Sequence, residues 1–163
     1  MIRIGIIGYG YWGPNLVRNF MNVEGCIVSH ICDLDIKKLE IAKKKYPSIN
    51  TTNSIDQVFE NSEIDAVVIA TPVSTHYDLA SKALESNKHT LVEKPLTNNV
   101  EQAQILGKKA KDKNKILMID HTYLYTPAIQ KIKELIDSDS LGEIQYIDST
   151  RINLGLFQTD VNV

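Results

Sequence analysis

Three glycines near the amino terminus follow the spacing G-x-G-x-x-G, a pattern that can hold a dinucleotide. They are Gly8, Gly10 and Gly13, and they come directly after an apolar run and before a segment with helical spacing. In that context the first glycine permits a tight turn, the second lets the backbone approach a pyrophosphate, and the third lets helix and strand pack closely. The sequence therefore predicts a dinucleotide-binding turn, with the intervening Tyr11 and Trp12 as further candidate contacts.

An acidic residue lies at the expected distance from this turn. Asp33 follows Gly13 by twenty residues, at the end of a second apolar run in the stretch HICDLD. A carboxylate there can accept hydrogen bonds from the ribose hydroxyls of adenosine, and it repels a 2′-phosphate. The nearest basic residues, Lys37 and Lys38, come one helical turn later, which favours NAD over NADP. The alternative is that Asp33 only caps the helix that begins near Asp35.

The elements that must position these residues alternate between strand-like and helical patterns over the first 120 residues. Short apolar runs predict strands, and amphipathic spacing predicts the helices between them. Alternation at this spacing implies parallel crossovers, and hence an α/β fold with a doubly wound parallel sheet of the Rossmann type. The predicted strands are 2–7, 27–32, 48–52, 65–70, 89–92 and 116–119, and the predicted helices are 15–23, 35–46, a brief one from 54, 75–86 and 100–111.

The pattern changes after Asp120, where we place the end of a dinucleotide-binding domain, 1–120. A helix is predicted over 127–137, with Pro127 in its first turn, and a strand with one polar face is predicted over 143–153. We therefore expect 121–163 to be a linking helix and the first strand of an incomplete substrate domain. The unpaired edge of that strand would favour self-association, so a homo-oligomer is expected.

Two further stretches lie at the ends of predicted strands, where doubly wound sheets bind ligands. They are ATPVSTHYDLA and VEKPL, and with the glycine turn, Asp33 and a late LGEI they make the chain resemble the Gfo/Idh/MocA family of NAD(P)-dependent oxidoreductases. The resemblance extends over essentially the whole sequence. It implies that Thr71 and Pro72 line the adenosine and nicotinamide-ribose side of the cofactor, with His76 near the same wall.

The same resemblance assigns roles to the E-K-P stretch. Glu93 would contact the cofactor, and Lys94 would face both nicotinamide and substrate, behind a peptide bond to Pro95 that is commonly cis in the family. An ammonium group there can hydrogen-bond the hydroxyl that is oxidised, so Lys94 is the catalytic candidate. The alternative is an ordinary solvated lysine. His121, after the last predicted strand, is a further candidate cofactor contact, although Thr126 replaces the asparagine often found before the nearby proline.

By this resemblance the function is hydride transfer from a sugar or nucleotide-sugar ring hydroxyl to NAD. The family places a proton-accepting histidine in its substrate domain, and no histidine follows His121 here. We therefore expect this chain to bind cofactor but to lack the full catalytic set. The alternative is a stand-alone NAD-binding sensor or regulatory module. A methyltransferase that binds S-adenosylmethionine is disfavoured by the full glycine spacing, Asp33 and the E-K-P stretch.

Composition excludes other classes of protein. Of 163 residues, 43% are hydrophobic and 23% charged, which is typical of a soluble globular protein, and the net charge of −2 gives no sign of a nucleic-acid or acidic-membrane partner. No membrane span or signal peptide is expected. Cys26 and Cys32 lack the spacing of a metal site and are expected to be free thiols, which favours a cytoplasmic location. We expect His30 and His89 to be structural.

Overall fold

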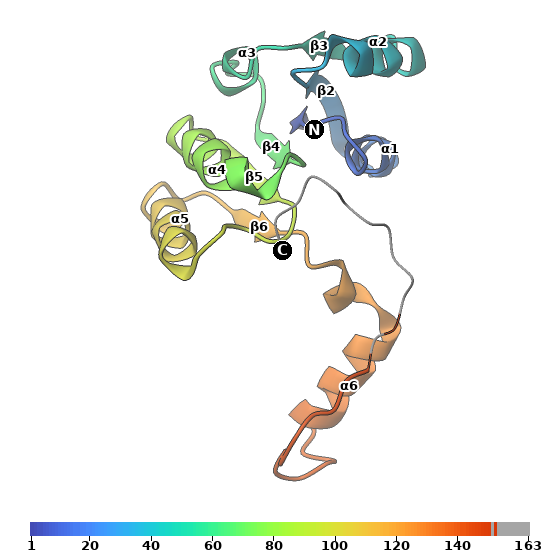
Figure 1. The fold of residues 1–163 in the computed structure, drawn as a ribbon, viewed down its shortest axis with the longest axis vertical. Helices are drawn as coiled ribbons and strands as arrows, with labels where there is room; N and C mark the ends of the chain where they lie inside the picture. Colours follow the sequence, from blue (N-terminus) through green and yellow to red (C-terminus); the bar gives the residue numbers. More distant parts are fainter. Residues whose placement is uncertain (151, 153–163) are drawn as a thin grey trace. The chain divides into compact units, whose positions relative to one another are not determined.

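The computed structural model describes residues 1–150 and 152, and the chain divides into two compact units, Met1–Asp120 and His121–Val163. The first unit is built on a six-stranded sheet in the order β3-β2-β1-β4-β5-β6, and every neighbouring pair is parallel (Figure 1). The predicted doubly wound α/β fold is thus confirmed. The strands are β1 (Ile2–Ile7), β2 (Cys26–Cys32), β3 (Asn50–Thr52), β4 (Ala66–Ile69), β5 (His89–Val92) and β6 (Leu117–Ile119).

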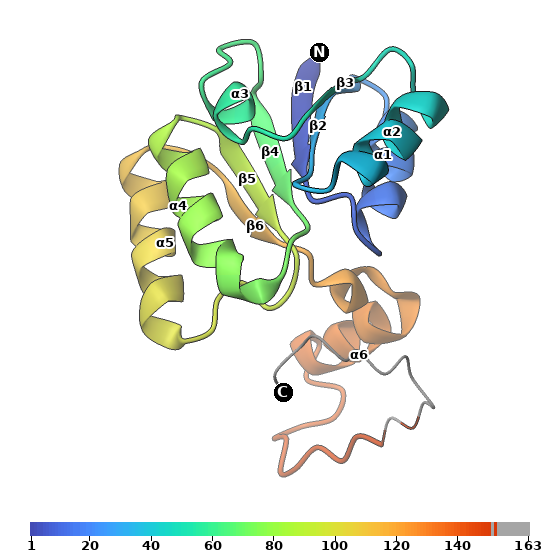
Figure 2. The same cartoon turned by 45° about the horizontal axis from the view of Figure 1, so that its top comes forward.

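Helices cover both faces of this sheet. Helices α1 and α2 lie on one face, and α3, α4 and α5 lie on the other (Figure 2). All predicted bounds in this unit agree with the structure to within two residues, and a short 3₁₀ helix, η1 (Val73–Thr75), was not predicted. The helices are α1 (Gly13–Met21), α2 (Ile36–Lys45), α3 (Asp56–Phe59), α4 (His76–Glu85) and α5 (Val100–Asp112).

The central strands are buried on both faces, as their continuous apolar runs predict. Because successive side chains on a strand point to opposite faces, Val68 belongs to one hydrophobic cluster while Val67 and Ile69 belong to the other. The cluster on the α1–α2 face includes Leu16, Val17, Leu39 and Ala42, and the opposite cluster includes Val58, Phe59, Ala80, Ala83, Leu84, Leu106 and Ala110. Two separate cores therefore hold the sheet from either side.

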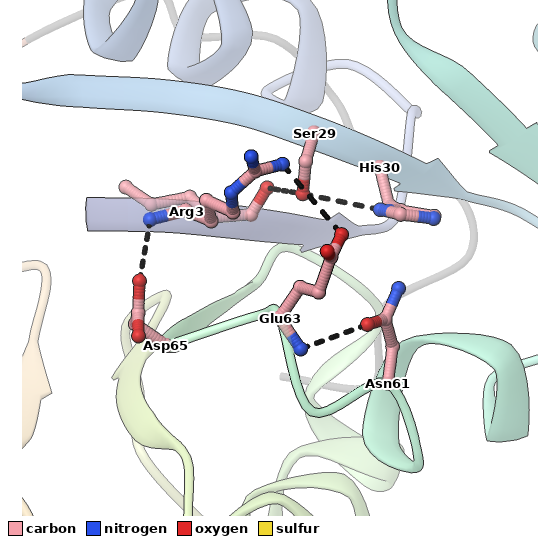
Figure 3. A network of polar contacts seen from close by, with 7 residues as sticks. Arg3, Ser29, His30, Asn61, Glu63 and Asp65 are labelled. Carbon is pink, nitrogen blue, oxygen red and sulfur yellow. Dashed lines mark hydrogen bonds and ion pairs between the residues drawn. The ribbon is translucent and has the colours of Figure 1, made fainter. Parts of the chain in front are cut away.

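Polar contacts fasten the amino ends of β1 and β4, on the edge away from the glycine turn (Figure 3). The backbone N–H of Arg3 donates to the Asp65 carboxylate at 2.8 Å, and the Arg3 guanidinium lies 3.7 Å from Glu63. His30 Nδ1 pairs with the Ser29 hydroxyl at 3.1 Å, and burial lowers the pKa of His30 against the opposing charge of Glu63. These contacts agree with a structural role for His30.

The second unit contains a short 3₁₀ helix, η2 (Thr122–Tyr125), and helix α6 (Pro127–Asp137), which has the predicted bounds. The predicted strand 143–153 is not formed: residues 143–150 have no regular structure, and residues 151 and 153 lie outside the described part of the chain. A strand needs hydrogen bonds from a partner, and no described residue pairs with this segment. The sheet edge on which self-association was predicted is therefore absent from the described residues.

Within the described residues, 1–150 and 152, every helix is too short or too polar to span a bilayer.

The burial of the central strand β4 can be tested by mutation. Ile69 in β4 is fully buried, whereas Ile105 on α5 is 47% exposed. We expect Ile69→Ala to lower the free energy of unfolding by about 2–5 kcal/mol, because it removes buried methyl groups and leaves a cavity. Ile105→Ala is the matched control and should change it by less than about 1 kcal/mol. Denaturant titration of both variants measures this, and equal losses would contradict the assigned burial.

Candidate functional site

The glycine turn joins three strand ends. Gly8 has a φ of +99°, and its N–H donates to the Cys32 carbonyl at the end of β2 at 2.8 Å. A Cβ atom at Gly8 would overlap the carbonyl oxygen of Ala70, directly after β4, and a Cβ atom at Gly13 would overlap the carbonyl oxygen of Gly8. Two of the three glycines are therefore required by close backbone approach and, at Gly8, also by a left-handed conformation.

Gly10 differs from its two neighbours in the motif. A Cβ atom there would have no atom within 4 Å, so this side of the turn is open. Helix α1 begins beside it with Trp12 as the capping residue, no side chain accepts from its first N–H groups, and no acidic residue lies in its first turn. Pro14 has no N–H, and the N–H of Asn15 donates to the Trp12 carbonyl at 3.0 Å. The positive end of the helix dipole, next to open space, fits the pyrophosphate of a dinucleotide.

Asp33 fastens the glycine turn to the end of β2. Its Oδ2 accepts from the Tyr9 N–H at 2.6 Å, and its Oδ1 accepts from the Asp35 N–H at 2.8 Å. The alternative that Asp33 caps α2 is wrong, because Asp35 is the capping residue and accepts from the Lys37 N–H at 2.9 Å. Lys38 Nζ also lies 4.0 Å from Oδ1. Because a carboxylate has about four acceptor positions, Asp33 retains capacity for ribose hydroxyls.

The segment after β4 is tied to the segment after β5. The hydroxyls of Thr71 and Thr75 pair at 2.7 Å, and Thr75 also donates to the Pro72 carbonyl. His76 is 1% exposed, and its two ring nitrogens lie 2.8 Å from the carbonyl oxygens of Thr71 and Pro95. Both of its polar atoms are thus occupied by backbone, so His76 faces protein and not an open cleft.

Two carboxyl groups leave adjacent strand ends side by side. Val92 and Ile119 are paired in the sheet, so the next residues, Glu93 and Asp120, are neighbours across β5 and β6. Glu93 Oε1 is shielded from solvent and has no donor, and the two carboxyl groups hydrogen-bond only when one of them holds a proton. Burial and the charge of Asp120 raise the pKa of Glu93 to about 7, against an opposing effect of Lys94.

The remaining predicted residues are more exposed. Lys94 is exposed, and its peptide bond to Pro95 is cis, as the resemblance implied. Tyr11 and Trp12 are 74% and 41% exposed, with stacked rings 6.1 Å apart. His121 begins the second unit, so its contact with a cofactor stays a prediction.

Sequence reasoning missed two parts of the site. The N–H of Tyr9 is the donor that joins the turn to Asp33, and Asp120 is the partner of Glu93. Asp120 had a usable signal, because it follows a predicted strand directly, as Glu93 does. No such signal marks Tyr9, since the bond uses its backbone. In the described part of the chain, His, Cys, Asp and Glu side chains form no cluster of three that could hold a metal.

A parallel sheet with its ligand edge built around a glycine turn, an acidic residue after β2 and an open helix terminus defines a dinucleotide-binding Rossmann domain. Residues 2–121 match the family model described as "Oxidoreductase family, NAD-binding Rossmann fold". The chain belongs to this family, Gfo/Idh/MocA, as the resemblance predicted.

Relatives of known sequence and structure agree with this. The chain is 31% identical over 152 residues to the uncharacterized oxidoreductase YdgJ of Escherichia coli, covering 91% of this chain and 42% of that protein. It is 30% identical over 152 residues to scyllo-inositol 2-dehydrogenase (NAD(+)) of Bacillus subtilis, covering 92% and 44%. An NAD-binding protein from Listeria innocua superposes with a TM-score of 0.78 at 31% identity, covering 87% and 42%. The chain thus spans about two-fifths of the length of these relatives.

The carboxyl pair predicts a pH dependence of stability. A pKa raised from 4.5 to about 7 means that between these values the folded chain binds more protons at Glu93 than the unfolded chain. The free energy of unfolding therefore falls as pH rises through this window. Glu93→Gln replaces the carboxyl with a neutral amide, so the variant should gain stability relative to the parent from pH 4.5 to 7. Denaturant titration at several pH values measures the difference, and a constant difference would refute the raised pKa of Glu93.

Proposed function

We propose that this chain binds NAD along the glycine turn and belongs to an enzyme that removes hydride from the carbon bearing a ring hydroxyl of a sugar-like substrate. The observation that carries the proposal is the open space beside Gly10 at the uncapped amino end of α1. A diphosphate placed there lies at the positive end of the helix dipole, where no side chain comes within 4 Å of the position of a Cβ atom on Gly10. Asp33, already held against the turn, is in place to accept the ribose hydroxyls of the adenosine half.

The other predicted contacts extend this path toward the nicotinamide. Thr71 and Pro72 follow β4, and Glu93 follows β5, so all three lie at the carboxyl edge of the sheet. The buried Glu93 Oε1 that lacks a donor suits a hydroxyl of the nicotinamide ribose. The exposed rings of Tyr11 and Trp12 are available to cover the cofactor from outside.

The reaction assigned to this site is oxidation of an alcohol. NAD, when bound, supplies the hydride acceptor. Lys94 hydrogen-bonds the substrate hydroxyl and stabilises negative charge that develops on its oxygen, while the hydroxyl proton passes to a base that the substrate domain of the enzyme supplies. The scyllo-inositol dehydrogenase among the relatives supports a cyclic polyol or sugar substrate, and a nucleotide sugar stays within the proposal. The proposal includes that this chain by itself binds cofactor without efficient turnover.

Calorimetric titration of the chain with NAD, and separately with NADP, tests the cofactor site. We expect NAD to bind at least about tenfold more tightly, because the Asp33 carboxylate accepts from ribose hydroxyls and repels a 2′-phosphate. Tighter binding of NADP would contradict the role given to Asp33. Absence of any binding by a chain whose circular dichroism is that of a folded protein would refute the proposed site.

Glycine variants separate binding from folding. Gly10→Ala adds a methyl group where the structure has open space, so we expect unchanged stability and at least about tenfold weaker NAD binding. Gly107→Ala is the matched control: a Cβ atom there also meets nothing within 4 Å, it lies on α5, and it should leave NAD affinity unchanged. Calorimetry and thermal melts measure both properties, and equal NAD affinities for the two variants would contradict the pyrophosphate position.

Lys94→Ala distinguishes an enzyme from a sensor that only binds NAD. In a form of the protein that turns substrate over, we expect the variant to lose at least about a hundredfold in kcat, since it removes the donor to the reacting hydroxyl. Its NAD affinity should change by less than about threefold. Steady-state kinetics and calorimetry measure the two quantities, and a variant with parental kcat would remove Lys94 from the reaction.

A further inference from the structure

We infer that His76 is a positioning residue, which ties the segment carrying Lys94 to helix α4 through the carbonyl oxygen of Pro95. The first observation is the burial of the side chain. His76 is the first residue of α4, and the ring is 1% exposed, so its nitrogens depend on protein partners and not on water. A buried polar group without a partner is costly, and the ring therefore holds its partners in place.

The second observation is the identity of the two partners. Nδ1 lies 2.8 Å from the Pro95 carbonyl oxygen, and Nε2 lies 2.8 Å from the Thr71 carbonyl oxygen. Carbonyl oxygens only accept hydrogen bonds, so each contact is a bond when the nitrogen concerned carries a proton. A neutral ring carries one N–H and donates to one of the two carbonyls, and that proton is assigned to Nδ1, which faces Pro95.

The two bonds differ in what they add. Thr71 precedes His76 by five residues and is already held near it, because the N–H of Thr75 donates to the Pro72 carbonyl at 2.9 Å and the Thr71 and Thr75 hydroxyls pair. Pro95 is nineteen residues away in the sequence and belongs to the segment that follows β5. The bond from Nδ1 therefore links two separate strand–helix connections of the sheet.

The consequence for chemistry follows from sequence adjacency. Pro95 is joined to Lys94 by a peptide bond, so fixing the Pro95 carbonyl restricts the backbone from which the lysine side chain extends. This consequence rests on the proposed function, in which Lys94 contacts the reacting hydroxyl. The tie itself does not, because it is a property of the chain without cofactor. His76 thus acts on the site through the backbone, without contact to cofactor or substrate.

Two isosteric variants separate the two bonds. In His76→Asn the amide nitrogen takes the place of Nδ1 and keeps the bond to Pro95, whereas in His76→Gln it takes the place of Nε2 and keeps the bond to Thr71. Amide hydrogen exchange of residue 94 and of residues 96–98, followed by NMR on the whole chain, is the measurement; Pro95 has no amide proton. We expect parental exchange in His76→Asn and about tenfold faster exchange in His76→Gln, as for the loss of one hydrogen bond.

The matched variants also make the inference refutable. Equal acceleration in both would mean that the ring acts only by packing, and no acceleration in His76→Gln would mean that the bond to Pro95 holds nothing in place. Either result overturns the inference, as does acceleration in His76→Asn alone. Thermal melts of both variants show whether each remains folded during the measurement.

A parallel NAD titration separates this inference from the proposed function. If the parent chain binds no NAD, the proposed function fails, while the exchange experiment still decides the role of His76. If the parent binds NAD, we expect His76→Gln to weaken binding more than His76→Asn, because residues 93 and 94 lie in the released segment. If the two variants bind NAD equally but differ in amide exchange, the hydrogen bond from His76 to Pro95 holds the segment, but this does not affect cofactor binding.

Discussion

The site depends on the close approach of backbone segments at two glycines of the turn. At Gly8 and Gly13 the backbone of one segment lies against the backbone of another, and any side chain would overlap a carbonyl oxygen. This close approach brings the end of β1, the start of α1 and the end of β4 together at one edge of the sheet. The open space beside Gly10 exists because the turn on either side of it is so tightly held. The close packing at Gly8 and Gly13 and the open space at Gly10 are therefore two features of the same turn.

The other residues of the site are held in place by hydrogen bonds between segments that follow different strands. Asp33 binds the turn from the end of β2, and His76 lies between the segments after β4 and β5. Glu93 and Asp120 meet because their strands are parallel neighbours. A parallel sheet brings the carboxyl ends of all its strands to one edge, so residues that are far apart in sequence become a single surface. The polar contacts of Arg3 lie at the opposite edge of the sheet and take no part in the site.

The fold was predictable from the sequence because its signals are local. Apolar runs such as 65–70, the spacing of the three glycines and the helix signal at Pro127 each depend on neighbouring residues, and all gave elements close to those observed. For the site, sequence motifs identified individual side chains but not the hydrogen bonds that hold them in place. The bonds of Tyr9 to Asp33 and of His76 to Pro95 join residues 24 and 19 positions apart, and side-chain periodicity carries no information about them. The strand predicted over 143–153 shows a second limit: residues 143–150 have no regular structure, because an alternating pattern permits a strand but does not supply its partner.

The position of Ala70 against Gly8 also sets an order of events during synthesis. Gly8 leaves the ribosome 62 residues before Ala70, whose carbonyl group packs against it. Strands β1 and β2 can pair early, but β1 has a central neighbour, β4, that emerges later. The nascent amino-terminal half therefore carries an unpaired strand edge and an unfinished turn until β4 docks. The wall of the glycine turn is therefore complete only when the chain up to Ala70 has been made and β4 has docked beside β1.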